Sequence, residues 1–201
     1  MLEAISQFDT WLFLKLNAGA ANPACDWLMP WVTELQHWLP IIVLGLAAVA
    51  IFGKGRGRTI VLTAVVLFAL TDQVSSHLIK PLVARPRPCH TVEGVRLLYR
   101  CGATYAFPSS HAVTTMAAAI FFGLLYQRML WPLLTLSLLI SYSRIYLGIH
   151  YPLDTLGGWV LGAAMSLGGI WLYRNKIQPF ANRFRWFRDD SKVNSPPIDA
   201  T

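Results

Sequence analysis

Five long apolar segments constrain the fold of this chain more than any other feature of its sequence. Each approaches the roughly 20 residues that a helix needs to cross a lipid bilayer. Hydrophobic residues make up 55% of the 201-residue chain and charged residues only 13%, unlike the composition of soluble domains. We therefore predict an all-α fold, a polytopic membrane helix bundle with about five transmembrane helices. The predicted spans are residues 38–52, 59–79, 112–126, 130–142 and 155–173.

The N-terminal segment, residues 1–20, predicts an interfacial helix that lies along the membrane surface. Glu3 and Asp9 stand where a signal peptide has basic residues, and the apolar positions are spaced on one face of a helix. We expect a membrane domain over residues 1–176, followed by a basic cytoplasmic tail, residues 177–201, that is partly disordered. A basic turn over residues 53–58 is expected between the first two spans.

The distribution of basic residues predicts the orientation of the chain. They are scattered between apolar runs and form no continuous stripe, which argues against a nucleic-acid partner despite the formal charge of +7. Threading the chain through five spans puts ten basic residues on one side and seven on the other. Because cytoplasmic loops are enriched in Lys and Arg, we predict a multi-pass protein of the cell (inner) membrane with a cytoplasmic C-terminus. The loop over residues 80–108 then faces the periplasm or the outside.

Three polar stretches meet at this outer face, although they lie far apart in the sequence. They are "KPLVARPRP", "PSSH" and "SRIYLGIHYPLD". Ionisable groups at membrane depth are costly and indicate function by default. We therefore expect one site. Its candidate residues are Lys80, Arg87, Ser109, Ser110, His111, Ser143, Arg144, His150 and Asp154.

The residue types in this set favour a ligand with several anionic oxygens. Lys80, Arg87 and Arg144 supply positive charge, and the planar fork of arginine matches phosphate oxygens. Ser109 or Ser110 can cap the helix that begins there, while the free backbone N–H groups of its first turn face the same anion. The pattern predicts a phosphate-binding site.

The two histidines predict a covalent mechanism. Asp154 follows His150 by four positions, so its carboxylate can accept the imidazole Nδ1–H and leave Nε2 free to attack phosphorus. His111 has no such partner nearby and can protonate the leaving oxygen. Hydrolysis of the resulting phosphohistidine completes the reaction. The sequence offers no carboxylate cluster for magnesium, so we expect no metal and no other cofactor.

At these positions the sequence resembles the type-2 phosphatidic acid phosphatase superfamily. The family's first signature, a lysine, six residues and Arg-Pro, is similar to the stretch from Lys80 to Arg87-Pro88. Its second, usually Pro-Ser-Gly-His, is similar to residues 108–111, with Ser110 in place of the commoner glycine. The third, Ser-Arg, five residues, His, three residues and Asp, is matched by Ser143, Arg144, His150 and Asp154. Three motifs in order are far more specific than any one of them.

The resemblance implies a role for each matched residue. His150 would be the nucleophile, His111 the acid and Asp154 the orienting partner. Phosphate would be bound by Lys80, Arg87, Ser109, Arg144 and the backbone of Ser110. The resemblance thus implies a membrane phosphatase that cleaves a lipid phosphate or diphosphate, with undecaprenyl diphosphate favoured. Phosphatidylglycerophosphate, phosphatidate and lipid A 1-phosphate follow as substrates.

Two other functions fit parts of the pattern. A small transporter or flippase would bind lipid phosphate at the same basic site without cleaving it, and release of inorganic phosphate separates the two. Haloperoxidase chemistry, also found in this superfamily, has no need of five spans. Each motif alone also has a structural interpretation, such as helix capping by serine or snorkelling by arginine. For Asp72 and His77, which match no motif, we favour hydrogen bonding between helices.

Two of the three cysteines are expected to form a disulfide. Cys89 and Cys101 lie twelve positions apart in the outward loop, where disulfides persist, and the alternative is two free thiols. A bridge would hold Arg87 against the segment leading to Pro108. Cys25 would remain unpaired.

Overall fold

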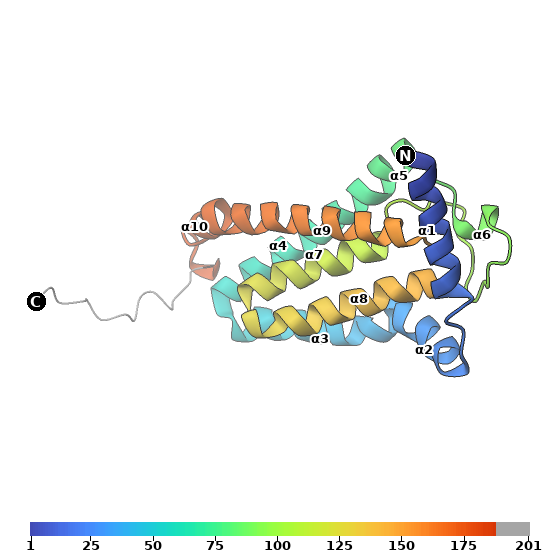
Figure 1. The fold of residues 1–201 in the computed structure, drawn as a ribbon. Coiled ribbons are helices and arrows are strands. Elements are labelled where there is room, and N and C mark those ends of the chain that lie inside the picture. The colour runs from blue at the N-terminus through green and yellow to red at the C-terminus, as the bar shows by residue number, and fades with distance from the viewer. Residues whose placement is uncertain (188–201) are drawn as a thin grey trace, which may run out of the picture.

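The computed structural model describes residues 1–187, which fold into helices joined by short loops, with no strand in that range (Figure 1). The predicted disorder at the end of the tail falls on residues 188–201 and lies outside the described residues. In chain order the principal helices are α1 (Leu2–Asn17), α2 (Pro23–Thr33), α3 (Leu35–Phe52), α4 (Lys54–Gln73), α5 (Lys80–Val83), α6 (Pro88–Thr91), α7 (Ser110–Leu125), α8 (Leu130–Tyr146), α9 (Pro152–Leu172) and α10 (Gln178–Ala181).

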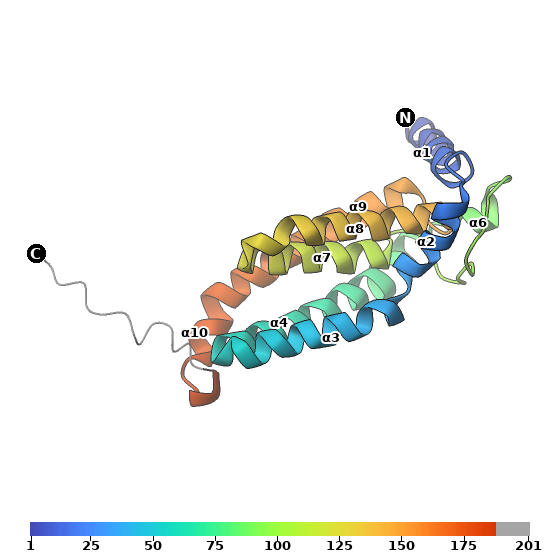
Figure 2. The same cartoon turned by 90° about the horizontal axis from the view of Figure 1, so that it is seen from below.

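The five longest parallel elements coincide with the predicted spans. Helices α3, α4, α7, α8 and α9 run side by side in a bundle, with α1, α2 and α6 at one end and α10 at the other (Figures 1 and 2). Within residues 1–187, three stretches are long and apolar enough to cross a membrane, namely Leu35–Phe52, Lys54–Thr91 and Pro152–Ala181. Helix α7 is apolar but shorter. The protein is therefore a helical membrane protein.

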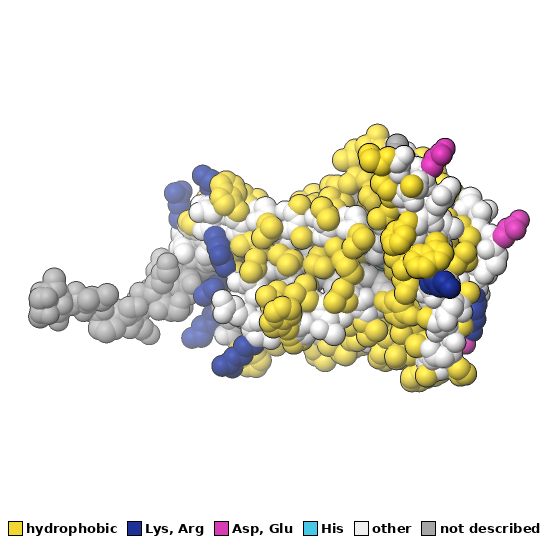
Figure 3. Space-filling model, in the orientation of Figure 1, with side chains coloured by type: hydrophobic (Ala, Val, Ile, Leu, Met, Phe, Trp, Pro, Cys, Tyr) yellow, Lys and Arg dark blue, Asp and Glu magenta, His cyan; other side chains and the backbone are white. Residues whose placement is uncertain are grey.

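The outer surface of the bundle is apolar, as expected of a protein that contacts lipid. Helix α3 exposes Leu44, Ile41 and Phe52 by 69%, 63% and 83%. Figure 3 shows this apolar surface along the middle of the molecule, with basic side chains gathered near α10. Exposure of this kind in water would favour aggregation, whereas in a bilayer it is the preferred state.

Helix α1 lies across the end of the bundle, where an interfacial helix was predicted (Figure 1). Its buried Phe13 contacts Tyr151 with the ring centroids 5.5 Å apart, whereas Phe8 and Trp11 are exposed. Asn17 Nδ2 donates to the backbone oxygens of Tyr146 and Arg96. One face of α1 is thus fixed to the bundle, and its exposed aromatic side chains are suited to a membrane interface.

Helix α2 was not predicted from the sequence. Asn22 caps it by accepting from the Cys25 N–H at 2.9 Å, and Pro23 stands at its first position. This start signal was available in the sequence. The helix has only 11 residues and includes Pro30, so its periodicity is too brief to be distinctive.

The prediction of a basic turn over residues 53–58 was wrong. The chain reverses at Gly53, and α4 already begins at Lys54. Gly57 allows this tight reversal, because a Cβ there would overlap the carbonyl oxygen of Val49 on α3. A compact glycine contact therefore replaces the expected loop.

Close packing of α7 against α9 positions two of the three motifs. Gly162 on α9 has no room for a Cβ, since that atom would overlap the Val113 carbonyl oxygen on α7. Ser166 Oγ donates to the Ala117 carbonyl at 3.0 Å, and Ser109 N–H donates to the Asp154 carbonyl at 3.0 Å. The start of α7 is consequently fixed beside the start of α9.

A π-helical segment, Val74–Ile79, links α4 to α5. Ser75 is buried within this segment and Lys80 is buried directly after it, five positions later, while Leu78 is 55% exposed. In an uninterrupted α-helix the buried positions recur after three or four residues. The π-helical turn therefore brings Lys80 to the face that packs inside the bundle.

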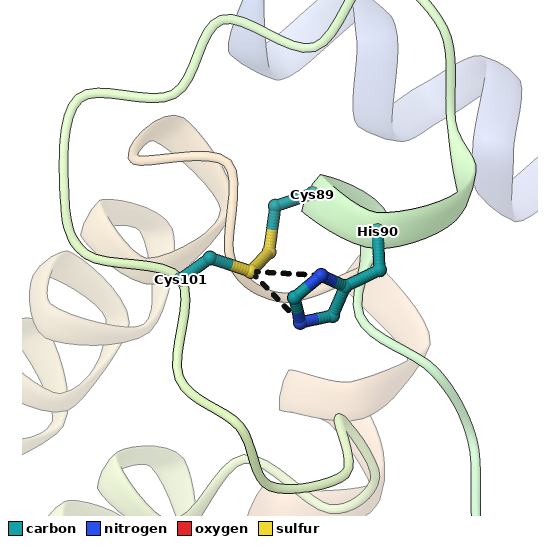
Figure 4. Close-up of side chains that lie close together, drawn as sticks. All are labelled: Cys89, His90 and Cys101. Carbon is teal, nitrogen blue, oxygen red and sulfur yellow. Dashed lines mark hydrogen bonds between the residues drawn. A yellow bond between two sulfur atoms is a disulfide. The ribbon is translucent and has the colours of Figure 1, made fainter.

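The loop after α5 contains the two cysteines expected to pair. Figure 4 shows Cys89 and Cys101 joined as a disulfide, with their Cα atoms 6.3 Å apart and the His90 ring beside Cys101 Sγ. Cys25 is free. The bridge ties α6, which directly follows Arg87, to the extended segment that leads to α7.

The described part of the tail packs against the far end of the bundle. Trp186 stacks under the Arg58 guanidinium at 4.1 Å from the ring centroid and accepts a hydrogen bond from it through its backbone oxygen at 3.1 Å. At least up to residue 187, the tail is therefore attached to the start of α4.

Candidate active site

The three sequence motifs converge at the end of the bundle covered by α1 and α2. Lys80, Arg87, Arg144, His150 and Asp154 are all less than 10% exposed. The charges of Lys80, Arg87 and Arg144 act on both His111 and His150, which places all five groups within electrostatic range of one another. The expected set therefore lies together, although its members come from the ends of four helices and from two loops.

Arg87 is positioned by the loop that precedes α7. Its Nε donates to the Thr104 carbonyl at 2.7 Å, and Nη2 donates to the Thr104 hydroxyl at 3.0 Å. Nη1 lies 3.4 Å from the Ile149 carbonyl, next to His150. These bonds orient the guanidinium but leave it without a carboxylate partner among the described residues, so its charge is available to an anion.

Arg144 is positioned from α2. Its Nη1 donates to the Thr33 hydroxyl at 2.8 Å, and its guanidinium lies 5.6 Å from the centroid of the Tyr99 ring. Arg144 Nε is buried and makes no hydrogen bond within the described chain. A buried donor without a partner is costly, and a phosphate oxygen would satisfy it.

The start of α7 differs in detail from the expected serine cap. Ser109 is the N-cap residue, but its side chain makes no capping bond, and its Oγ is buried without a partner in the described chain. Ser110 Oγ instead lies 2.9 Å from Ser75 Oγ and 3.3 Å from Ser76 Oγ in the π-helical segment. The Ser109 hydroxyl is thus free for a ligand, while the Ser110 hydroxyl joins α7 to the segment that carries Lys80.

His150 and Asp154 lie side by side, but not at hydrogen-bonding distance. Nδ1 of His150 is 3.5 Å from Oδ2 of Asp154 and makes no hydrogen bond within the described chain. The predicted Nδ1–H bond to the carboxylate is therefore absent from this structure, because Asp154 Oδ2 accepts the Tyr151 N–H at 2.8 Å and caps α9. Burial, followed by the charges of Arg144 and Arg87, holds the pKa of His150 well below its usual value. The imidazole is consequently neutral, as a nucleophile must be.

His111 occupies the first turn of α7 and is partly buried. Its backbone oxygen accepts a hydrogen bond from Thr115 Oγ1 at 2.7 Å, which supports that turn. His111 lies within electrostatic range of His150, Lys80, Arg87 and Arg144. The two imidazoles therefore come from different elements and belong to the same cluster of ionisable groups.

Sequence reasoning missed several residues that support the site. Arg85 was not among the candidate site residues, yet it forms ion pairs with Asp9 and Asp154. Thr33 and Thr104 orient Arg144 and Arg87, respectively. The sequence did carry a signal for Asp9, since it is an acidic residue next to the apolar stretch of the N-terminal helix. The two threonines carry no comparable signal, because their roles depend on tertiary contacts.

Asp72 and His77 lie outside this site. Both side chains are exposed, and Asp72 accepts a hydrogen bond from Ser76 on its own helical segment at 3.3 Å. The favoured interpretation, a hydrogen bond between helices, was therefore wrong for Asp72.

Among residues 1–187, three potential metal-ligating side chains gather only at Cys89, His90 and Cys101. Two of these three are joined in the disulfide, and His90 Nε2 lies 3.2 Å from Cys101 Sγ (Figure 4). This group lies in the loop between α5 and α7, apart from the candidate site residues.

An apolar cleft of about 270 Å³ opens beside the site. It lies between α1, α5 and the start of α9, and Arg85 forms part of its wall. The other lining residues are Ile5, Ser6, Val83, Phe107 and Leu153. A hydrocarbon chain fits the chemistry of these walls.

Comparison with known proteins relates the whole arrangement to one family. Residues 59–178, which contain all three motifs, match the model of the PAP2 superfamily. The chain is 33% identical to a lipid A 4'-phosphatase from Bacteroides thetaiotaomicron over 86% of this chain and 78% of that protein. It is also 33% identical to the undecaprenyl-diphosphatase BcrC from Bacillus subtilis, over 80% of this chain and 81% of that protein.

A solved structure supports the same fold. The crystal structure of a transmembrane PAP2 type phosphatidylglycerolphosphate phosphatase from Bacillus subtilis aligns with a TM-score of 0.68 at 20% identity. The alignment covers 86% of this chain and 88% of that one.

Proposed function

Because the chain belongs to the PAP2 superfamily, we propose that it is an integral membrane phosphatase that hydrolyses a lipid phosphate or diphosphate through a phosphohistidine intermediate. The observation that carries this proposal is the convergence of Lys80, Arg87 and Arg144 around two histidines in one buried place. Three cations in proximity repel one another, and an anion with several negative oxygens relieves that repulsion.

Each matched residue has a definite role in the proposed reaction. The phosphoryl oxygens bind Lys80, Arg87, Arg144 and the unpartnered Ser109 hydroxyl, together with the backbone N–H groups at the start of α7. His150 Nε2 attacks phosphorus as the bond to the leaving oxygen breaks, and His111 donates a proton to that oxygen. The Asp154 charge stabilises the positive charge that develops on the His150 ring.

Hydrolysis of the intermediate restores the enzyme. His111, now neutral, removes a proton from water, whose oxygen attacks phosphorus. The P–N bond to His150 breaks, and its electron pair returns to Nε2. Inorganic phosphate leaves, and His111 again carries a proton. Every charge that the phosphoryl group develops is matched by a fixed cation of the chain, so this sequence of steps requires no metal.

We further propose that α3, α4, α7, α8 and α9 all cross the membrane, giving five spans. The end with Lys54, Arg56, Arg128, Arg174 and Lys176 would be cytoplasmic, since all of these side chains are exposed there. The site would then face the outer leaflet of a cell (inner) membrane. An alkaline phosphatase fusion at an external position, compared with one after residue 187, tests this orientation.

Long-chain lipids are the proposed substrate class, with undecaprenyl diphosphate favoured and lipid A phosphates next. The names of the relatives include both activities. The apolar cleft beside Arg85 supports a substrate with a hydrocarbon chain that enters next to α1. Ile5→Trp would fill the cleft and lower hydrolysis of long-chain substrates relative to a water-soluble aryl phosphate. Gln7→Trp, on an exposed position outside the cleft, is the matched control.

Release of inorganic phosphate by the purified protein tests the proposal directly. Undecaprenyl diphosphate, phosphatidylglycerophosphate, phosphatidate and lipid A would each be presented in detergent, with and without a chelator. We expect release that the chelator does not change and that His150→Ala abolishes. Binding of these lipids without any release would favour a transporter. Activity lost in chelator and restored by magnesium would refute the metal-independent mechanism.

A further inference from the structure

A chain of three charged groups, in which both carboxylates are buried and the guanidinium is partly exposed, links the N-terminal helix to the candidate active site. Arg85 Nη1 donates to Asp154 Oδ1 at 2.8 Å, and Arg85 Nη2 donates to Asp9 Oδ2 at 2.6 Å. Asp9 is 1% exposed and Asp154 is fully buried. One guanidinium therefore joins two carboxylates that are 145 positions apart in the sequence, one on α1 and one on α9.

The surroundings of Arg85 fix its orientation. Its guanidinium lies over the Tyr151 ring, 4.0 Å from the ring centroid. Tyr151 itself contacts Phe13 of α1 and is 5% exposed. A planar cation held by an aromatic face and two carboxylates has little freedom to rotate.

Asp9 is also attached directly to the start of α9. Its Oδ1 accepts the Leu153 N–H at 2.9 Å, while Oδ2 accepts from Arg85. Burial raises the pKa of the Asp9 carboxyl, and the Arg85 hydrogen bond opposes that rise. The Asp9 carboxylate faces the bundle and not water, so its role is not to keep α1 soluble.

The Asp154 carboxylate depends on Arg85 for its position, because few other groups bind it. Its carboxylate does not form a hydrogen bond to His150 in this structure, so His150 cannot fix its position. The two groups that do bind it are the Tyr151 N–H and Arg85, each at 2.8 Å. Of these two, only Arg85 binds through its side chain, so only the Arg85 contact can be removed by substitution.

We propose that Arg85 and Asp9 are positioning residues for the phosphatase reaction, which keep the Asp154 carboxylate beside His150 and make α1 a part of the active site. This inference rests on the function proposed above. Neither residue touches the phosphoryl group. They act through Asp154, so their loss should slow the chemical step without weakening substrate binding.

A pair of neutralising substitutions tests the inference without leaving Asp9 as a buried charge that has lost its partner. In the double variant Asp9→Asn/Arg85→Gln, both charges are removed together. We expect kcat for phosphate release from a water-soluble aryl phosphate, which does not occupy the apolar cleft, to fall about tenfold, with KM within about twofold of the wild-type value. The same double substitution in an Asp154→Asn background should cause no further loss, because the residue through which it acts is already altered.

The ion pair of Arg96 with Asp26 provides a matched control. It also joins an N-terminal helix to the outer loop, and its nearest other side chain is Tyr146, which has no proposed role. The variant Asp26→Asn/Arg96→Gln should retain kcat. The thermal midpoint of each variant, read by intrinsic fluorescence in detergent, shows whether a loss of activity reflects unfolding.

The outcomes separate this inference from the proposed function. If wild-type protein releases no phosphate, both fall. If wild-type protein is active and the Asp9→Asn/Arg85→Gln variant matches it, the positioning role alone is refuted. A loss that is equal in the wild-type and Asp154→Asn backgrounds, or that the control variant shows equally, also refutes it, since such a loss is merely structural.

Discussion

The substitution Asp154→Asn tests the proposed mechanism by removing the buried carboxylate charge beside His150. In the reaction, the His150 ring gains a positive charge when it bonds to phosphorus, and the Asp154 carboxylate oxygen lies 3.5 Å from Nδ1. Two unit charges at that separation interact by about 5 kcal/mol at an effective dielectric constant of about 20. At about 1.4 kcal/mol per tenfold change in rate, this interaction corresponds to a factor of about 3,000.

Arg85 reduces that figure, because its guanidinium is 2.8 Å from the same carboxylate and takes up part of the charge. We therefore expect Asp154→Asn to lower kcat by about 10²- to 10³-fold, which is less than the roughly 10⁴-fold effect of the equivalent substitution in serine hydrolase triads. The amide must also place its NH₂ group toward one of two donors, the Tyr151 N–H or Arg85. We expect this to destabilise the protein by about 1–3 kcal/mol.

Rapid-quench measurement of phosphoenzyme, together with steady-state phosphate release, is the appropriate assay. The loss should appear in the rate at which phosphoenzyme forms, and a thermal melt should show that the variant is folded at the assay temperature. Glu93→Gln is the control, since that carboxylate is exposed in the loop between α6 and α7. A variant whose phosphoenzyme forms within threefold of the wild-type rate would show that the carboxylate charge does not act on His150.

Three further predictions concern other parts of the mechanism and the loop. His111→Ala should still form phosphoenzyme from a substrate with a good leaving group, which needs no proton, but should hydrolyse it slowly; rapid quench with an aryl phosphate would reveal an equal loss in both steps if the assignment is wrong. Because burial lowers the pKa of His150, its ring stays neutral on acidification, so phosphoenzyme formation from an aryl phosphate, which needs no proton from His111, should be constant from about pH 8 to about pH 6; a halving near the usual histidine pKa of about 6.5 would contradict this. Thiol labelling of the unreduced, denatured protein should modify Cys25 alone, whereas labelling of Cys89 and Cys101 as well would exclude the disulfide and weaken the predicted orientation.

Much of the fold was predictable because a bilayer imposes simple rules on a sequence. Apolar length predicted the positions of α3, α4, α7, α8 and α9, since each helix that crosses lipid must satisfy its own backbone. The fixed spacing of the motifs predicted which residues would gather at one end. Both signals are local in the sequence and need no knowledge of packing.

The parts that were not predictable depend on contacts between distant residues. Whether Asp154 would bond to His150 or cap its own helix depends on the Tyr151 N–H and on Arg85, and spacing alone does not distinguish these outcomes. Thr33 reaches Arg144 only because α2 packs on α8. The tight reversal at Gly53 was misjudged because its basic residues suggested a loop, while the glycines permit close contact between helices.

The π-helical turn before α5 gives the family's first motif an unusual sensitivity to length. Each residue of an α-helix turns the chain by about 100°, so one residue more or less rotates everything that follows by that angle. The segment Val74–Ile79 contains the extra residue that lets Ser75 and Lys80 share the buried face. Deleting one residue there would leave Lys80 four positions after Ser75, which is still the buried face of a regular α-helix. Inserting a further residue would instead turn Lys80 by about 100° away from that face, although every motif residue would still be present in the sequence. In comparisons with relatives, the helical face on which the lysine lies should therefore be checked as well as the aligned motif. The number of residues between α4 and Lys80 decides which side chain points into the candidate site.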